Sequence, residues 1–250
     1  MVRVLAALFL WAAVEATAVA QTITAVQDAG SYTTNVARGG LFVVKGSGLS
    51  GSGFNEATAP YGTSIGGTSV TFTPTAGGTG TKAYLIYTYN QNGVNQIAGL
   101  VPSTLAAGNY SVTVTYNNTT GAPAQTQVLA AKPALLTQDS SGSGLALVQN
   151  YVSSSQYDIN RLTTGTVSGN TISPAQPGQT LIAWGTGLGA VPFPDNTPPS
   201  GGYNYPNVQV IVGGTVITPA YAGPSAYPGL DQINFTLPST VSTGCAMSVQ

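Results

Sequence analysis

One run of glycines matches the spacing of a dinucleotide-binding loop. Gly46-Ser47-Gly48-Leu49-Ser50-Gly51 fits G-x-G-x-x-G and follows an apolar segment that we expect to be a strand. Dinucleotide binding needs a helix directly after the glycines, to face the pyrophosphate, and an acidic residue about 20 positions later. The residues that follow, 52–62, have the composition of a loop instead. The sequence therefore predicts no cofactor at this run.

Catalysis is limited by the residues that the sequence lacks. The 250 residues include no histidine and one cysteine, Cys245, which excludes Ser-His-Asp and Cys-His arrangements and zinc sites with histidine ligands. Two carboxylates could hydrolyse a glycoside, but the acidic residues after position 20 are isolated from one another. We predict no enzyme, and no catalytic, cofactor-binding or metal-binding residues. These acids are Asp28, Glu56, Asp139, Asp158, Asp195 and Asp231.

Two segments offer oxygen atoms for calcium, which are Asp195-Asn196 and Asp139 with the Ser/Gly-rich loop after it. Neither has the Asp-x-Asp-x-Asp pattern of a calcium loop. Asp and Asn side chains commonly cap turns. Turn capping is therefore the favoured interpretation, and we expect chelators to leave stability unchanged.

Tyrosine is the enriched residue type that could bind a ligand. All thirteen tyrosines follow residue 20, and four of them lie within 25 positions. A tyrosine ring has an apolar face and a polar tip, which suits stacking on sugars or contact with a protein. Alternating tyrosines such as Tyr87 and Tyr89 are explained equally by a half-buried sheet face, and we favour that structural explanation. The four clustered residues are Tyr203, Tyr205, Tyr221 and Tyr227.

The sequence contains an internal repeat. Gly39–Leu49 aligns with Gly178–Leu188 at an offset of 139 positions, and Asn95–Thr104 aligns with Asp231–Thr240 at an offset of 136. Two matches in the same order, at nearly equal offsets, predict two copies of one unit. We place the first domain at 21–131 and the second at 132–250, with the junction near Lys132.

The expected secondary structure is all-β. No convincing amphipathic helix is present, and short alternating or apolar runs recur between turn signals, as in β-sandwiches. Asn92-Gly93 predicts a tight hairpin between 83–89 and 94–101, and Pro228-Gly229 is its counterpart in the second unit. The predicted strands are 41–45, 69–73, 83–89, 110–116, 180–184, 208–212 and 232–237.

Composition and the N-terminal residues predict export. Charged residues make up only 5% of the chain, and five bases face six acids after residue 20, so nothing resembles a basic nucleic-acid surface. Residues 1–20 have the charged start, short apolar centre and Ala18-Val19-Ala20 ending of a signal peptide that is cleaved after Ala20. The apolar run is too short to span a bilayer. We expect a secreted or cell-surface protein without a membrane span.

Two expectations concern the C-terminal end. Cys245 cannot form an internal disulfide, and it is either a small buried side chain or the partner of a cysteine beyond residue 250. At the 136 offset, residues 115–131 of the first unit have no counterpart. We therefore expect the second domain to be truncated, less stable than the first, and open to strand exchange between chains.

Several of these motifs carry a family resemblance. Gly46–Leu49 after a strand and Ala107–Val114 near the end of the unit resemble IPT/TIG domains, which are immunoglobulin-like. The second half is similar to the C-terminal module of a largely uncharacterised family of secreted soil-bacterial proteins. The resemblance implies tandem immunoglobulin-like sandwiches and export, and it supplies no catalytic residues. The segments of the second half that match are Pro133–Leu136, Pro177–Gly189, Tyr221–Gly223 and Asp231–Pro238.

The sequence thus favours a non-enzymatic adhesion or binding module at the cell surface or in the extracellular space. Polysaccharide or another surface protein is the expected partner, bound by loops and exposed tyrosines. One alternative is a structural spacer or self-associating surface-layer subunit. The other is an accessory domain of a secreted hydrolase.

Overall fold

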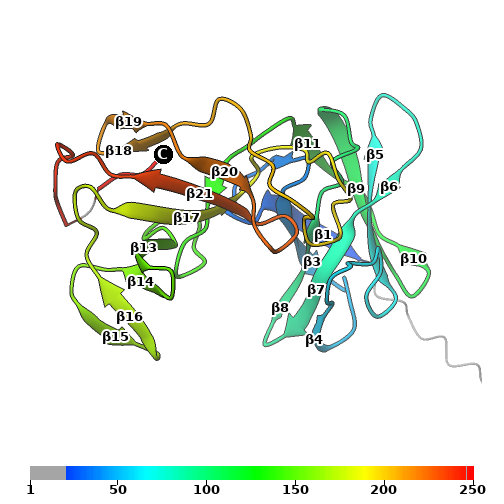
Figure 1. The fold of residues 1–250 in the computed structure, drawn as a ribbon. Helices are drawn as coiled ribbons and strands as arrows, with labels where there is room; N and C mark the ends of the chain where they lie inside the picture. Colours follow the sequence, from blue (N-terminus) through cyan, green and yellow to red (C-terminus); the bar gives the residue numbers. More distant parts are fainter. Residues whose placement is uncertain (1–20, 246) are drawn as a thin grey trace, which may run out of the picture.

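The computed structural model describes residues 21–245 and 247–250, which form twenty-one β-strands (Figure 1). None of these residues is helical, so the all-β prediction is confirmed. No helix within the described ranges could therefore cross a membrane. The predicted signal peptide, residues 1–20, lies outside the described residues.

Two sheets form the first half of the chain. The first has the strand order β1-β3-β8-β7-β4, and the second has the order β2-β11-β9-β5-β6, with β10 paired to β9. The bounds in the first sheet are β1 Thr22–Asp28, β3 Leu41–Ser47, β8 Val94–Leu100, β7 Tyr84–Gln91 and β4 Gly53–Glu56. Those in the second are β2 Val36–Ala37, β11 Ala124–Leu129, β9 Gly108–Tyr116, β5 Thr68–Pro74, β6 Thr81–Lys82 and β10 Thr119–Thr120.

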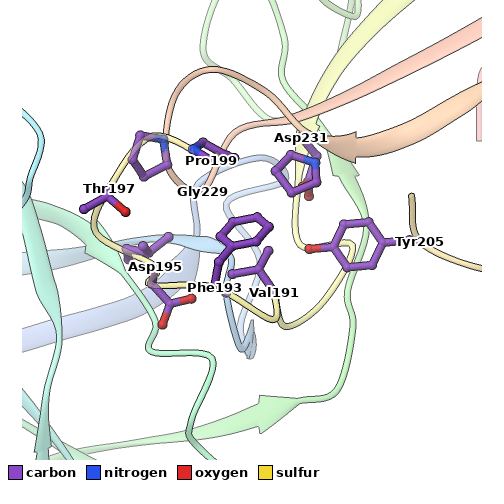
Figure 2. A pocket seen from close by; sticks show the side chains of 12 residues that line it. Val191, Phe193, Asp195, Thr197, Pro199, Tyr205, Gly229 and Asp231 are labelled. Atoms are coloured by element: carbon purple, nitrogen blue, oxygen red, sulfur yellow. The ribbon is translucent and has the colours of Figure 1, made fainter. Parts of the chain in front are cut away.

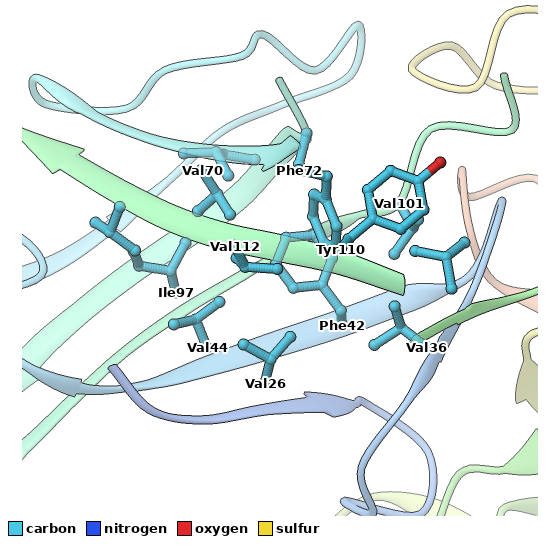
Figure 3. Close-up of a cluster of buried hydrophobic side chains, with 14 of the residues drawn as sticks. Val26, Val36, Phe42, Val44, Val70, Phe72, Ile97, Val101, Tyr110 and Val112 are labelled. Atoms are coloured by element: carbon cyan, nitrogen blue, oxygen red, sulfur yellow. The ribbon is translucent and has the colours of Figure 1, made fainter. Parts of the chain in front are cut away.

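An apolar core joins these two sheets (Figure 3). Phe42 on β3 and Phe72 on β5 are fully buried and meet edge to face, with ring centroids 5.4 Å apart. Val44 and Val112 continue the contact along β3 and β9. Alternate residues of each strand point inward, as expected for a sandwich of two packed sheets.

The second half has one larger sheet and a two-stranded sheet. The larger has the order β15-β16-β14-β13-β17-β21-β20, with β12 also paired to β17, and β18 pairs with β19. A second apolar cluster includes Leu181, Val210 and Phe235. The bounds are β12 Ala134–Leu135, β13 Val148–Ser153, β14 Gln156–Asn160, β15 Gly165–Val167, β16 Asn170–Ser173, β17 Thr180–Thr186, β18 Val210–Val212, β19 Thr215–Ile217, β20 Tyr221–Pro224 and β21 Asp231–Thr236.

The aligned segments of the repeat have the same pairing in both halves. Lys45 on β3 is opposite Gln96 on β8, and the aligned residues Trp184 on β17 and Gln232 on β21 are opposite each other. A sheet register is fixed by which face is buried, so equal registers mean equal inward faces. The offsets of 139 and 136 therefore describe equivalent strand pairs. The division into two domains stays a prediction.

All seven predicted strands are present, with ends that differ by a few residues. The predicted strands omit several that the structure contains, among them β1, β13 and β4, and the last of these lies in the stretch 52–62 that was predicted to be a loop. They also omit β14, β15 and β16, which form an addition to the second half between residues 156 and 173. These strands are short, and their residues are mostly polar. Their pattern therefore resembles a loop more than a buried strand.

The Asn92-Gly93 hairpin is confirmed. Gln91 on β7 pairs with Val94 on β8, and both turn residues have positive φ, 54° for Asn92 and 76° for Gly93. This is the geometry of a two-residue turn between twisted antiparallel strands.

Replacing Gly93 with valine is expected to destabilise the protein by about 1–2 kcal/mol, because a β-branched residue is strained at positive φ. A Cβ atom at this position would meet no atom within 4 Å, so the cost comes from the backbone alone. Thermal unfolding measures the effect, and Gly93→Asn is the matched control because asparagine tolerates this conformation. Equal melting temperatures for wild type and Gly93→Val would contradict the turn geometry.

Candidate functional site

The glycine run that resembles a dinucleotide loop is a structural turn. It leads into β4, which is a strand, so no helix N-terminus faces the glycines. Gly48 has a φ of 65°, and Gly187 in the aligned segment has a φ of 89°. The same turn therefore occurs in both halves, and the prediction against cofactor binding rests on the absence of the helix that phosphate binding requires.

The first glycine of each turn is required by a neighbouring strand. A Cβ atom on Gly46 would lie 1.9 Å from the carbonyl oxygen of Thr22, and one on Gly185 would lie 2.7 Å from that of Ala134. Real Cβ atoms essentially never approach this closely. Backbone packing thus explains the repeated glycine without any ligand.

A polar side chain from the next strand holds each turn. The Leu49 amide donates to the Asn95 Oδ1 at 2.7 Å, and the Leu188 amide donates to the Asp231 Oδ2 at 2.9 Å. Both acceptors are buried. The aligned Asn95 and Asp231 therefore have one structural role, but the second half performs it with an ionisable group.

Asp231 lies beside a very small pocket (Figure 2). Burial raises the pKa of the Asp231 carboxyl to about 7, although the hydrogen bond from Leu188 acts in the opposite direction. The pocket has a volume of ≈ 10 Å³, and Phe193, Asp195 and Tyr205 also line it. This is about the space of one water molecule. This pocket is therefore too small to hold a substrate, and Asp231 also lines a second, larger cavity.

Residues of the 190–197 loop connect the two halves of the chain. The Ser103 amide donates to Asp195 Oδ2 at 2.8 Å, and the Tyr61 amide donates to the Asn196 carbonyl at 2.8 Å. Burial raises the pKa of the Asp195 carboxyl, partly offset by the bond from Ser103. Asp195 Oδ2 and the Asn196 carbonyl, two of the oxygens considered for calcium, are thus used in contacts between the halves, whereas Asp195 Oδ1 is buried without a hydrogen-bond partner.

The other acidic segment considered for calcium caps its own loop. Asp139 Oδ1 accepts hydrogen bonds from the Ser141 amide at 3.1 Å and from its hydroxyl at 2.8 Å. No group of three acidic, cysteine or histidine side chains within the described ranges could hold a metal ion. The favoured turn-capping interpretation agrees with this geometry.

Cys245 is exposed, so the expectation of a small buried side chain is wrong. It belongs to the irregular segment 242–245 after the last long strand, where no sheet covers it.

The four clustered tyrosines do not form a binding surface. Tyr205 is buried and donates its hydroxyl to the Gly189 carbonyl at 2.8 Å, and Tyr203 packs against its ring with centroids 5.0 Å apart. Tyr221 donates to the Pro224 carbonyl at 2.7 Å. Only Tyr227 is well exposed, at 67%. The favoured explanation, that these tyrosines have a structural role, therefore fits Tyr203, Tyr205 and Tyr221.

A second cavity, of ≈ 590 Å³, is lined mostly by residues of the second half, together with Ser31 and Ala131 of the first. Its apolar lining includes Leu135, Leu188, Val208, Val210 and Ile233. Asp231 is the only acidic or basic side chain among the described lining residues, and it already holds the Leu188 amide. The cavity therefore offers no pair of groups for acid–base catalysis.

The best candidate for binding is a group of aromatic side chains on the outer face of the first sheet. Phe54 on β4 is 52% exposed, and its ring lies 5.6 Å from Tyr87 and 6.3 Å from Tyr89 on β7. A bulge between Leu85 and Tyr87 shifts the β7 register, and Tyr87 and Tyr89 then lie on one face. We call Phe54, Tyr87 and Tyr89 the aromatic face.

Polar side chains continue the aromatic face across the sheet. Phe54 is opposite Tyr89, Tyr89 is opposite Gln96 on β8, and Gln96 is opposite Lys45 on β3. Gln96 Nε2 donates to the Tyr87 hydroxyl at 2.9 Å. Four neighbouring strands thus place two rings, an amide and an ammonium group in one row.

Sequence reasoning noted Tyr87 and Tyr89 but missed Phe54. Burial raises the pKa of the Tyr87 hydroxyl from its ordinary value of 10.0. The alternation of Tyr87 and Tyr89 was the available signal. Phe54 belongs to a loop-like stretch of sequence, and only the pairing of β4 with β7 brings it to the tyrosines.

No family model matches this chain, and no curated protein or solved structure matches it either. The resemblance to IPT/TIG domains and to secreted soil-bacterial proteins therefore stays a prediction. The functional argument rests on the side chains and their geometry.

Proposed function

We propose that this chain is an exported, non-enzymatic binding module that holds a polysaccharide on its aromatic face. The observation that supports the proposal is the exposed Phe54 ring, which lies within 6.3 Å of two tyrosine rings on a rigid sheet. An exposed group of aromatic side chains on a soluble protein commonly marks a binding surface.

Sugars fit the chemistry of this surface. The C–H face of a pyranose ring is apolar and stacks on flat aromatic rings, whereas its hydroxyls need donors and acceptors at the edge. Gln96, the tyrosine hydroxyls and the Lys45 ammonium supply such groups in the same row. An extended row also suits a chain of sugar units better than a single small molecule, which generally requires a concave pocket.

Several observations argue against catalysis. The six acids after residue 20 cap turns, connect the two halves or lie apart, and histidine is absent from the sequence. The pocket beside Asp195 and Asp231 is too small for a substrate. A role as an accessory domain of a secreted hydrolase is compatible with the same binding surface, and it is distinguished by a catalytic domain in the same gene.

Replacing Phe54 with alanine is expected to weaken polysaccharide binding about tenfold, because the removed ring is the most exposed part of the aromatic face. Pull-down on insoluble cellulose, chitin and peptidoglycan measures the retained fraction. Tyr227→Ala is the matched control, since this ring is more exposed than Phe54 but does not belong to the aromatic face.

Wild-type protein that is retained by none of these materials would overturn the proposal for this ligand class. Equal retention of wild type and Phe54→Ala would show that the aromatic face is not where the polysaccharide binds. The competing proposal of a purely structural spacer predicts both results.

A further inference from the structure

The strands added to the second half have an exposed apolar face. Ten large hydrophobic side chains are well exposed in the described structure, and five of them lie between residues 151 and 167. Such a concentration in one short segment differs from the scattered exposed apolar residues of an ordinary surface. These five are Tyr151, Val152, Tyr157, Leu162 and Val167.

Strand pairing places most of the apolar side chains on one side. Tyr151 on β13 is opposite Tyr157 on β14, with ring centroids 5.6 Å apart, and Ile159 is opposite Ile172 on β16. Val167 on β15 lies two residues from Gly165, which is opposite Ile172, so Val167 shares this side. We call the side with these residues the apolar strip.

The opposite side of the same strands carries polar side chains that mostly bond to one another, although the buried Asn150 Oδ1 has no hydrogen-bond partner. Asn150 is fully buried and donates to the Ser173 carbonyl at 2.7 Å, while Gln156 donates to Asp158 at 2.9 Å. On this side Asn150 and Asp158 are buried. On the apolar strip Tyr151, Tyr157 and Val167 are exposed, although Ile172 is buried. Such a face is typical of a protein–protein contact.

The edge strand beside the apolar strip also lacks the usual protection against pairing. Residues 162–173 contain no charged residue and no proline. Other edge strands are protected, since β4 ends at Glu56, β6 ends at Lys82 and β20 ends at Pro224. Charges and prolines at edges prevent pairing with another chain. All three residues of β15 are exposed.

We propose that β15 pairs antiparallel with β15 of a second copy of this chain, about a two-fold axis. With Thr166 opposite its own copy, each Val167 lies opposite Gly165 of the other molecule, and a large side chain packs over a residue that has none. This self-complementary sequence favours a second copy over an unrelated partner, because a two-fold contact uses the same surface twice. The pairing also satisfies main-chain groups that β15 otherwise exposes to water.

Analytical ultracentrifugation tests this proposal at concentrations from about 1 to about 300 µM, where weak interfaces dissociate. We expect the average mass to rise toward that of a dimer. Val167→Lys should raise the dissociation constant at least about tenfold, because it places a charge in the paired edge. Val216→Lys on β19 is the matched control, because Val216 is another exposed valine, on a strand outside the proposed contact, and this variant should associate like wild type.

Circular dichroism and the emission of Trp184, on the same sheet, verify that each variant is folded. A wild-type protein that stays monomeric over the whole range would overturn the proposal. Association that both lysine variants weaken equally, or that Val167→Lys leaves unchanged, would also overturn it.

Discussion

Replacing Asp231 with asparagine is expected to stabilise the protein at neutral pH and above. Asp231 is buried and accepts a hydrogen bond from the Leu188 amide, and burial raises the pKa of its carboxyl from 3.8 to about 7. Asparagine performs the same role in the first half, where Asn95 accepts the bond from Leu49. The variant keeps this acceptor and removes the cost of burying a charge.

The direction of the expected stability change follows from how the free energy of unfolding depends on pH. In the unfolded chain the carboxyl loses its proton near pH 4, but in the folded protein it keeps the proton until about pH 7. The folded state thus binds more protons between these values, so stability falls as pH rises from about 4 to 7. A shift of about three pKa units corresponds to up to about 4 kcal/mol, and Asp231→Asn should abolish this contribution.

Chemical unfolding at several pH values from 4 to 8 measures the effect. Asp139→Asn is the control, because this exposed residue caps a loop and should leave the slope between pH 4 and 7 unchanged. A wild-type stability that is flat between pH 4 and 7, or an Asp231→Asn variant with the wild-type slope, would show that the carboxyl is ionised at low cost in the fold.

Strands and turns were accessible from the sequence because their signals are local. Asn92-Gly93 determines a hairpin through its own backbone preferences, and residues 41–44 of β3 form an apolar run. The repeat added information of a different kind. It related Asn95 to Asp231 before either was known to hold a turn, but it did not indicate that burial would shift the pKa of the second.

The candidate binding site depends on contacts between distant residues, and sequence patterns do not report these. Phe54 joins Tyr87 and Tyr89 only because β4 is the edge strand beside β7. Tyr203 and Tyr205 are the same residue type as Tyr87 and could bind the same ligands. In the structure, however, Tyr203 packs against Phe193 and Tyr205, and Tyr205 donates to the Gly189 carbonyl. Exposure, which decides between these outcomes, is a property of the assembled sheets.

The second large effect is expected at Lys132, the predicted junction between the two halves. Its ammonium forms an ion pair with the buried Asp28 on β1 and donates to the Thr33 hydroxyl at 2.7 Å and to the Asn35 carbonyl at 3.2 Å. Its amide donates to the Gly187 carbonyl at 2.8 Å. Lys132 therefore connects β1 of the first sheet to the glycine turn of the second half, which contains Gly187.

Burial alone would raise the pKa of the Asp28 carboxyl, but the hydrogen bonds from Lys132 and Ser31 and the charge of Lys132 outweigh it and lower the pKa. A lowered pKa means that this carboxylate stabilises the fold above its ordinary value near 4, and that the contribution disappears as pH falls through the lower folded value. Without the ammonium group, the pKa should rise, and the loss should begin at higher pH.

Lys132→Met keeps the length of the side chain and removes its charge, and we expect it to cost about 2–3 kcal/mol at pH 7, because a buried carboxylate loses its cation. The partial exposure of Lys132, at 21%, places this expectation below the cost of a fully buried pair. The double variant Asp28→Asn/Lys132→Met should lose less than the sum of the two single changes, by about 1–2 kcal/mol, since it removes both charges and leaves none unpaired. Urea unfolding of the wild type, the two single variants and the double variant measures the four stabilities that this double-mutant cycle needs. Strictly additive losses would mean that Lys132 connects the halves through its backbone and the bonds to Thr33 and Asn35, with no contribution from its charge.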